Sequence, residues 1–129
     1  MIVVDSSVWI ANLRDQQSKA VGKLRAIDDP GTILVGDLIL LEVLQGARSD
    51  AHAVRIERAM REFTIESMLD EGIAVRAAAH YRFLRERGAT VRKTIDLVIM
   101  TFCLERRHVL LHDDRDFDAM AAHLPLRVM

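Results

Sequence analysis

The amino-acid sequence predicts an α/β fold in which a mostly parallel central sheet is flanked by helices. Short runs of β-branched and aliphatic residues alternate along the chain with amphipathic stretches, a pattern typical of parallel strands joined by helices. The first of these runs, IVV at 2–4, is continuously apolar, as expected of a strand that is buried in a sheet. The length of 129 residues suits one domain, so we expect residues 1–129 to form a single domain.

Capping and turn residues divide the first half of the chain into elements. Gly36 ends the second apolar run, and Asp37 is expected to cap the helix that follows it. Gly46 stands just past the end of that helix. The expected elements are a strand at 2–4, helices at 7–14 and 18–28, a strand at 32–35, and helices at 38–45 and 49–61.

The second half of the chain continues the alternation. Gly88 ends a long Ala-rich helical stretch, and Thr94 is expected to cap the apolar helix that comes next. The expected elements are a strand at 63–65, helices at 70–87 and 95–106, a strand at 109–111, a helix at 116–122 and an edge strand at 126–128.

Composition excludes several classes of protein. Half of the residues are hydrophobic and 29% are charged, which is enough apolar material for a core and argues against disorder. The single cysteine, Cys103, excludes a disulfide framework and a cysteine-rich zinc site. No apolar run approaches the ~20 residues of a membrane span, and the N-terminal segment does not resemble a secretion signal. We therefore expect a cytoplasmic protein without a membrane partner.

Carboxylates occur where the α/β pattern places a ligand crevice, beyond the carboxyl ends of the strands. Burying an unpaired carboxylate costs several kcal/mol, and no basic residue lies within the apolar runs that contain these acids. A hard divalent cation such as Mg²⁺ or Mn²⁺ is the simplest compensating charge. The acids are Asp5 after the first strand, Glu42 in the helix after the second, Asp96 in the helix before the fourth, and Asp113 and Asp114 after the fourth.

Each of these acids also has an ordinary structural explanation. Asp5 could cap the first helix, and Asp96 could interact with the dipole at the start of its own helix. Glu42 could lie on a solvent-facing stripe, and Asp113 and Asp114 could be turn residues. The coincidence of all these positions at one end of the sheet favours a metal site.

Four motifs together carry a family resemblance. They are the segment IVVDSSVWI at 2–10, Glu42 after an apolar helix start, IDLVI at 95–99, and HDDRDF at 112–117. In order, spacing and total length they resemble the PIN-domain ribonucleases, and more narrowly the VapC toxins of bacterial toxin–antitoxin pairs. Each motif is weak alone, whereas the ordered set is specific and runs essentially from end to end of the chain.

The resemblance implies a PIN-like α/β/α sandwich and a Mg²⁺-dependent endoribonuclease, with Mn²⁺ as a substitute. It implies that Ser7 is a supporting polar residue and that Asp116 is a further acid with a lesser role at the metal. The residues that match the family's catalytic and metal-binding acids are Asp5, Glu42, Asp96 and Asp114.

Two departures from the family pattern leave details open. His112 stands where Thr or Ser is commoner, and Asp113 stands where Asn is frequent, so either Asp113 or Asp114 could be the primary ligand. The number of metal ions is also open. Our hypothesis is that one ion is held by Asp5, Glu42 and Asp96, and that a second is completed or shared by Asp114 and Asp116.

The resemblance also implies partners. These are an RNA substrate, a VapB-like antitoxin that restrains the toxin, a second copy of the chain in a homodimer, and a toxin–antitoxin hetero-oligomer. Arg92 and Lys93, just before Asp96, are candidate contacts to RNA phosphates, although a solvated basic face is the alternative. Which RNA is cut does not follow from the sequence.

Other functions fit less well. A receiver domain needs adjacent acids after the first strand and a lone Asp after the third, whereas here one Asp follows the first and Glu66 the third. A haloacid-dehalogenase-type phosphatase needs an Asp where this chain has Ser7. A non-catalytic PIN-like RNA-binding module stays open as an alternative, and a metal titration separates it from the enzyme.

Overall fold

A single four-stranded sheet organises the structure, a computed structural model that describes residues 1–129. All strand pairs are parallel and the strand order is β3-β2-β1-β4, so the predicted parallel sheet is confirmed. The strands are β1 (Ile2–Val4), β2 (Ile33–Gly36), β3 (Thr64–Glu66) and β4 (Val109–Leu111).

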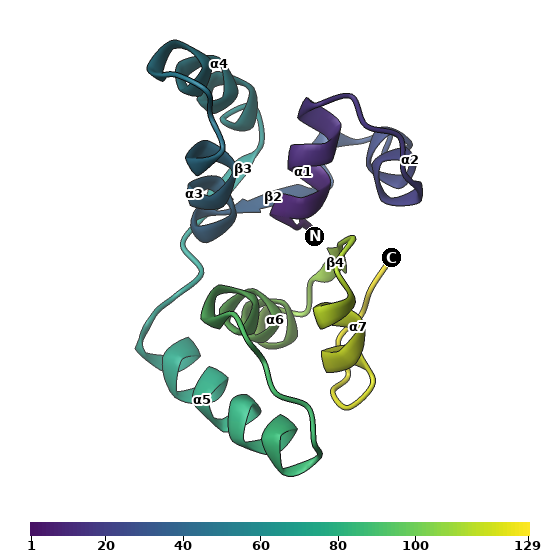
Figure 1. The fold of residues 1–129 in the computed structure, drawn as a ribbon, viewed down its shortest axis with the longest axis vertical. Coiled ribbons are helices and arrows are strands. Elements are labelled where there is room, and N and C mark those ends of the chain that lie inside the picture. The colour runs from purple at the N-terminus through teal and green to yellow at the C-terminus, as the bar shows by residue number, and fades with distance from the viewer.

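Seven α-helices flank this sheet, and each predicted helix is present with ends that differ by a few residues. Figure 1 shows helices α1 to α4 on one side of the sheet and α5 to α7 on the other. No helix has the length and apolar character needed to cross a membrane. The helices are α1 (Ser6–Leu13), α2 (Lys19–Arg25), α3 (Asp37–Gln45), α4 (Asp50–Met60), α5 (Glu71–Glu86), α6 (Thr94–Arg106) and α7 (Arg115–Ala121), and a 3₁₀ turn covers Pro30–Thr32.

The chain reverses its progress across the sheet after β3. The first three strands advance towards one edge, and α5 and α6 then return the chain to β4, which lies on the other side of β1. Because crossovers between parallel strands are right-handed, opposite directions of progress place helices on opposite faces. The topological switch point therefore lies at the carboxyl ends of the adjacent strands β1 and β4, which is where α/β sheets bind ligands.

Helix α6 lies in the interior of the molecule. Every residue from Asp96 to Cys103 is buried, including the wholly inaccessible Ile99, Met100 and Phe102. A helix that is apolar nearly all round must be covered on all sides, which explains why α6 packs between its neighbours rather than on the surface. This placement carries the first turn of α6, with its carboxylate, into the molecule.

The predicted cap of α3 is wrong. Gly36 occupies the N-cap, and no side chain there accepts a hydrogen bond. The Asp37 carboxylate Oδ1 instead accepts hydrogen bonds from the backbone N–H groups of Leu38, at 2.9 Å, and Met68, at 3.0 Å. Asp37 thus ties the loop after β3 to the start of α3.

Two further sequence-based predictions are wrong. Lys93 is the N-cap of α6 and makes no side-chain capping bond, while Thr94 is the first helical residue. The predicted edge strand at 126–128 is reduced to one parallel bridge between Leu110 and Val128. Three residues interrupted by the charged Arg127 are a weak strand signal, and here they pair with β4 at only one position.

Candidate functional site

Asp5 directly follows β1 and is the N-cap of α1. Its Oδ2 accepts hydrogen bonds from the backbone N–H of Ser7 at 3.1 Å and from the Ser7 hydroxyl at 2.6 Å. Its Oδ1 is buried and has no hydrogen-bond partner. The capping role that the sequence allows is therefore real, but it uses only one of the two carboxylate oxygens.

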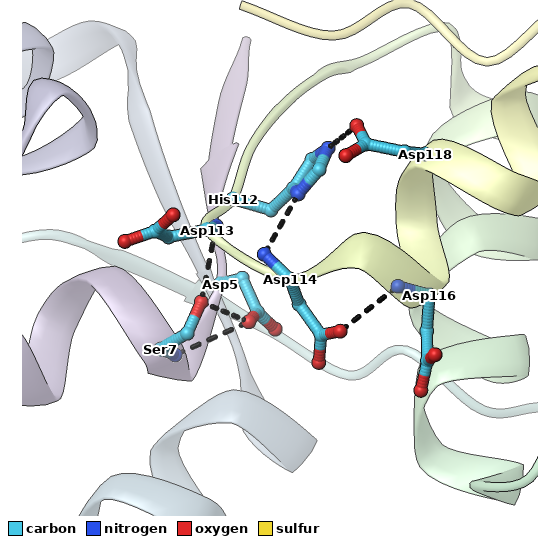
Figure 2. A network of polar contacts seen from close by, with 7 residues as sticks. All are labelled: Asp5, Ser7, His112, Asp113, Asp114, Asp116 and Asp118. Carbon is cyan, nitrogen blue, oxygen red and sulfur yellow. Dashed lines mark hydrogen bonds and ion pairs between the residues drawn. The ribbon is translucent and has the colours of Figure 1, made fainter.

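Asp114 lies between β4 and α7 in the way that Asp5 lies between β1 and α1. It is the N-cap of α7, and its Oδ1 accepts a hydrogen bond from the backbone N–H of Asp116 at 2.9 Å. Its own N–H donates to Nδ1 of His112 at 3.2 Å, so His112 is a polar neighbour of the site (Figure 2). Two strand-to-helix connections, one at each side of the switch point, thus present a carboxylate in the same way.

Asp113 takes a different direction from Asp114. The Asp113 side chain is exposed, and Figure 2 shows it pointing away from the Asp114 carboxylate. Its backbone N–H donates to the Ser7 hydroxyl at 3.3 Å and so links the β4–α7 loop to α1. Of the two adjacent acids, Asp114 is the one whose carboxylate joins the other acids.

Asp96 lies in the first turn of α6 and is only 4% exposed. Its Oδ2 is buried without a hydrogen-bond partner. The pKa of Asp96 is raised to about 7, chiefly by burial and then by the charge of Asp5, with smaller increases from Asp114 and Glu42 and an opposing effect of Lys93. If Asp96 only interacted with the dipole at the start of α6, its pKa would be lowered. The raised pKa instead shows that the ionised carboxylate lacks a compensating positive charge.

Glu42 is half-buried on α3 and accepts a hydrogen bond at Oε1 from the Ser6 hydroxyl at 3.1 Å. Burial raises the pKa of Glu42 above its usual value, the bond from Ser6 opposes that rise, and the charge of Asp5 adds to it. Glu42 therefore lies close enough to the β1 end to interact with the carboxylate there.

Three of the acids form a close group. Asp96, Asp114 and Asp116 each offer one carboxylate oxygen, and these oxygens lie within 4.8 Å of one another. A donor set made only of oxygens suits a hard divalent cation, and the unpartnered oxygens of Asp5 and Asp96 lack a positive charge. The residues present therefore fit a divalent metal ion. The structure associates Asp96 with Asp114 and Asp116, whereas our sequence hypothesis grouped it with Asp5 and Glu42.

Two basic residues lie beside the acids. Nη2 of Arg92 is 3.3 Å from Oδ1 of Asp116, and 79% of the Arg92 side chain is exposed. The charge of exposed Lys93 lowers the pKa of both Glu42 and Asp96. Both cations are thus at the solvent-facing side of the acidic group.

The family resemblance matches both Ser6 and Ser7 to small hydroxyl positions, and sequence reasoning favoured Ser7 as the supporting residue without assigning Ser6 a partner. Each serine donates to a different acid, Ser7 to Asp5 and Ser6 to Glu42. The signal was available, because neighbouring residues at a helix start point in different directions and two consecutive hydroxyls can therefore serve two different partners.

Known proteins resemble this chain in sequence and in fold. A family model described as "PIN domain" matches residues 2–123. Ribonuclease VapC11 of Mycobacterium tuberculosis is 32% identical over 124 residues, which cover 94% of this chain and 92% of VapC11. A structure of VapBC2 from Rickettsia felis, bound to a promoter DNA fragment, superposes with a TM-score of 0.79 at 12% identity, covering 100% of this chain and 98% of that one. A toxin–antitoxin complex from Klebsiella pneumoniae superposes with a TM-score of 0.69 at 19% identity, covering 91% and 90%.

Proposed function

The chain belongs to the VapC ribonucleases of the PIN-domain family, and from that membership we propose that it is the Mg²⁺-dependent endoribonuclease toxin of a VapBC-type pair. Mn²⁺ replaces Mg²⁺ in this proposal. The enzyme hydrolyses RNA phosphodiester bonds with water and inhibits translation and growth until an antitoxin neutralises it.

One observation carries the metal-dependent part of the proposal. The carboxylates of Asp5 and Asp96 are buried, each with one oxygen that has no hydrogen-bond partner, and the pKa of Asp96 is about 7. A divalent cation would remove this electrostatic strain. Asp96, Asp114 and Asp116 would hold it, with Asp5 and Glu42 completing the site directly or through water.

The chain's own residues prepare the site for hydrolysis. A bound divalent cation supplies a water of lowered pKa and neutralises charge that develops on the phosphate. Ser7 and Ser6 fix the carboxylates of Asp5 and Glu42 in one orientation each. Arg92 and Lys93 are placed to contact RNA phosphates at the rim. Water attacks the phosphorus and the bond between phosphorus and the 3′ oxygen breaks. The 3′ oxygen leaves as a 3′-hydroxyl, and the downstream fragment carries a 5′-phosphate.

Partners belong to the same proposal. The structures from Rickettsia felis and Klebsiella pneumoniae are complexes described as VapBC2 and as toxin–antitoxin, which supports a VapB-like antitoxin as partner here. We further propose that residues 1–129 act as one domain, that two copies form a homodimer, and that toxin and antitoxin form a hetero-oligomer in the cytoplasm.

Cleavage of total RNA tests the activity. The purified chain is incubated with total RNA and Mg²⁺, with and without chelator, and the new 5′ ends are sequenced. We expect discrete 5′-phosphate ends that are absent with chelator. Retained RNA binding without any metal-dependent cut would instead identify a non-catalytic RNA-binding module.

A matched pair of variants tests the site itself. Asp114→Asn should abolish these ends, while Asp113→Asn removes the same charge one residue away and should retain them. Equal loss in both variants would contradict the assignment of Asp114. Expression of the wild type alone should arrest growth, and co-expression of an adjacently encoded antitoxin should restore it.

A further inference from the structure

A basic cavity lies at the end of α6 that is remote from Asp96. It has a volume of about 260 Å³ and is formed where α6 ends, β4 begins and the C-terminal segment passes. Three of its lining residues are basic and none is acidic. The lining residues are Cys103, Leu104, Arg107, His108, Pro125 and Arg127.

Two arginines in this cavity have no carboxylate partner. Neither Arg107 nor Arg127 takes part in an ion pair, whereas the adjacent Arg106 lies 3.5 Å from Asp70. The Arg127 guanidinium donates a hydrogen bond to the main-chain carbonyl of Arg107, which fixes its position. Because a guanidinium carries five N–H donors, Arg127 retains donors for a further acceptor.

The backbone at Arg107 is unusual. Arg107 is the C-cap of α6 with φ 58° and ψ 40°, a left-handed conformation in which glycine is the favoured residue. A long charged side chain at such a position bears a conformational cost, and costs of this kind concentrate at functional sites. Glycine would end the helix without this cost, so the arginine is not explained by the helix end alone.

His108 completes the polar lining. Its ring packs on Phe102 with 5.4 Å between ring centroids, and its Nδ1 accepts a hydrogen bond from the Met1 amino group at 3.1 Å. This arrangement leaves Nε2–H as a donor on the neutral ring. Burial lowers the pKa of His108, and the charges of the N-terminal ammonium, Arg106 and Arg127 lower it further against the opposing effect of Glu66.

We propose that this cavity binds a phosphate-type oxyanion through the guanidinium groups of Arg107 and Arg127, with His108 as a neighbouring donor. Arginine forks match the oxygens of phosphate in geometry and charge. The volume lies below the roughly 300–1,000 Å³ of typical small-molecule sites, so the cavity suits one phosphate group rather than a whole nucleotide. The site goes beyond the proposed nuclease function and needs no metal.

Titration with inorganic phosphate in the presence of chelator tests the proposal, with the histidine ring signals followed by NMR. We expect a saturable change at His108, weakened about tenfold or more in Arg107→Gly and in Arg127→Gln. The control is Arg82→Gln, an exposed arginine of α5 outside all ion pairs, which should bind phosphate as the wild type does.

Arg107→Gly keeps the test free from folding defects. Glycine accepts the left-handed backbone without strain, so the melting temperature should be unchanged or higher while phosphate affinity falls. Absence of a saturable change at His108, or phosphate binding that is equal in all four proteins, would overturn the proposal.

A second experiment distinguishes two sources of the phosphate group, the RNA backbone and free phosphate. A single-stranded oligonucleotide that cannot be cut is titrated in chelator against the wild type and Arg127→Gln. Weaker oligonucleotide binding by the variant assigns the cavity to the RNA backbone, and unchanged binding assigns it to a free phosphate group. Both results support an oxyanion site. Neither depends on cleavage, so failure of the nuclease proposal would leave this test intact.

Discussion

The Asp5 carboxylate raises the pKa of Asp96, and only the burial of Asp96 has a larger effect. The two residues are 3% and 4% exposed, and each keeps one buried oxygen without a hydrogen-bond partner. One comes from the end of β1 and the other from the start of α6. In the metal-free protein the charge of Asp5 therefore opposes the ionisation of Asp96, and this opposition has measurable consequences.

Stability of the metal-free protein should fall as the pH rises from about 4 to about 7. The pKa of Asp96 is raised from 3.8 to about 7 on folding, so within this window the folded chain retains a proton that the unfolded chain has released. Each pH unit then lowers the free energy of unfolding by up to about 1.4 kcal/mol, and the raised pKa of Glu42 acts in the same direction. Denaturant unfolding in chelator at several pH values measures the slope. Asp96→Asn should flatten it, and a wild-type slope of opposite sign would contradict the assignment.

Asp96→Asn should separate catalysis from folding. The substitution keeps the shape of the side chain and removes one charge from the cluster, so metal-free stability at neutral pH should be unchanged or higher by about 0.5–2 kcal/mol. Cleavage should fall by orders of magnitude because a metal ligand is lost. Melting temperature in chelator and RNA cleavage in Mg²⁺ give the two readouts. An Asp96→Asn variant that cuts at nearly the wild-type rate would falsify the site assignment.

Metal binding should release a proton when the pH is below the Asp96 pKa of about 7. A cation coordinates the ionised carboxylate, so the proton held by Asp96 must leave. Calorimetric titration with Mn²⁺ in buffers of different ionisation enthalpy measures this release directly. Release should disappear at a pH well above that pKa and in Asp96→Asn. A heat of binding independent of the buffer at the lower pH would count against Asp96 as a ligand.

The two serines should differ in their effects. Ser7→Ala removes the 2.6 Å hydrogen bond to Asp5 and frees that carboxylate to rotate, so we expect activity to fall roughly 10–100-fold. The 3.1 Å hydrogen bond from Ser6 lowers the pKa of Glu42, so Ser6→Ala should raise that pKa. The acidic limb of the pH–rate profile should then shift to higher pH. Cleavage rates across a pH series check both. Identical profiles for the two variants would show that the serines do not act on separate acids.

Gly36→Ala should destabilise the fold around α3. A Cβ there would lie 2.0 Å from Sδ of Met68, whose side chain is buried, so the free energy of unfolding should fall by about 1–3 kcal/mol. Gly22→Ala is the matched control, because nothing lies within 4 Å of a Cβ inside α2, and it should stabilise by roughly 0.4–1 kcal/mol. Urea unfolding of the two variants gives both values. A neutral Gly36→Ala would mean that Met68 can move aside.

Much of the fold followed from local pattern, and the failures have a common physical cause. Apolar runs and glycines gave the strands and helices because they act within a few residues of the chain. The cap of α3 was wrong because the Asp37 carboxylate bonds to the N–H of Met68, a partner 31 positions away that no local rule contains. The bridge at Val128 likewise depends on its neighbour Leu110.

The candidate site shows the same division. The sequence predicted which acids lie at the strand ends, since an acid inside an apolar run is conspicuous. It did not predict that Asp96 groups most closely with Asp114 and Asp116, because that distance depends on how α6 packs beside β4. Asp5 and Asp114 each cap a helix through one carboxylate oxygen, which leaves the other oxygen of each available to the proposed metal ion.

The order of strands in the sheet also fixes when the protein becomes active. β4 is the last strand to be synthesised, yet it pairs with β1, the first, and only that pairing brings Asp114 beside Asp5. A nascent chain that has emerged as far as β3 contains Asp5 and Glu42 but lacks the acids after β4. Because proteins are made from the N-terminus onwards, the nuclease site cannot assemble before β4 and the residues just after it have been synthesised. The chain therefore cannot cut RNA until β4 has joined the sheet beside β1.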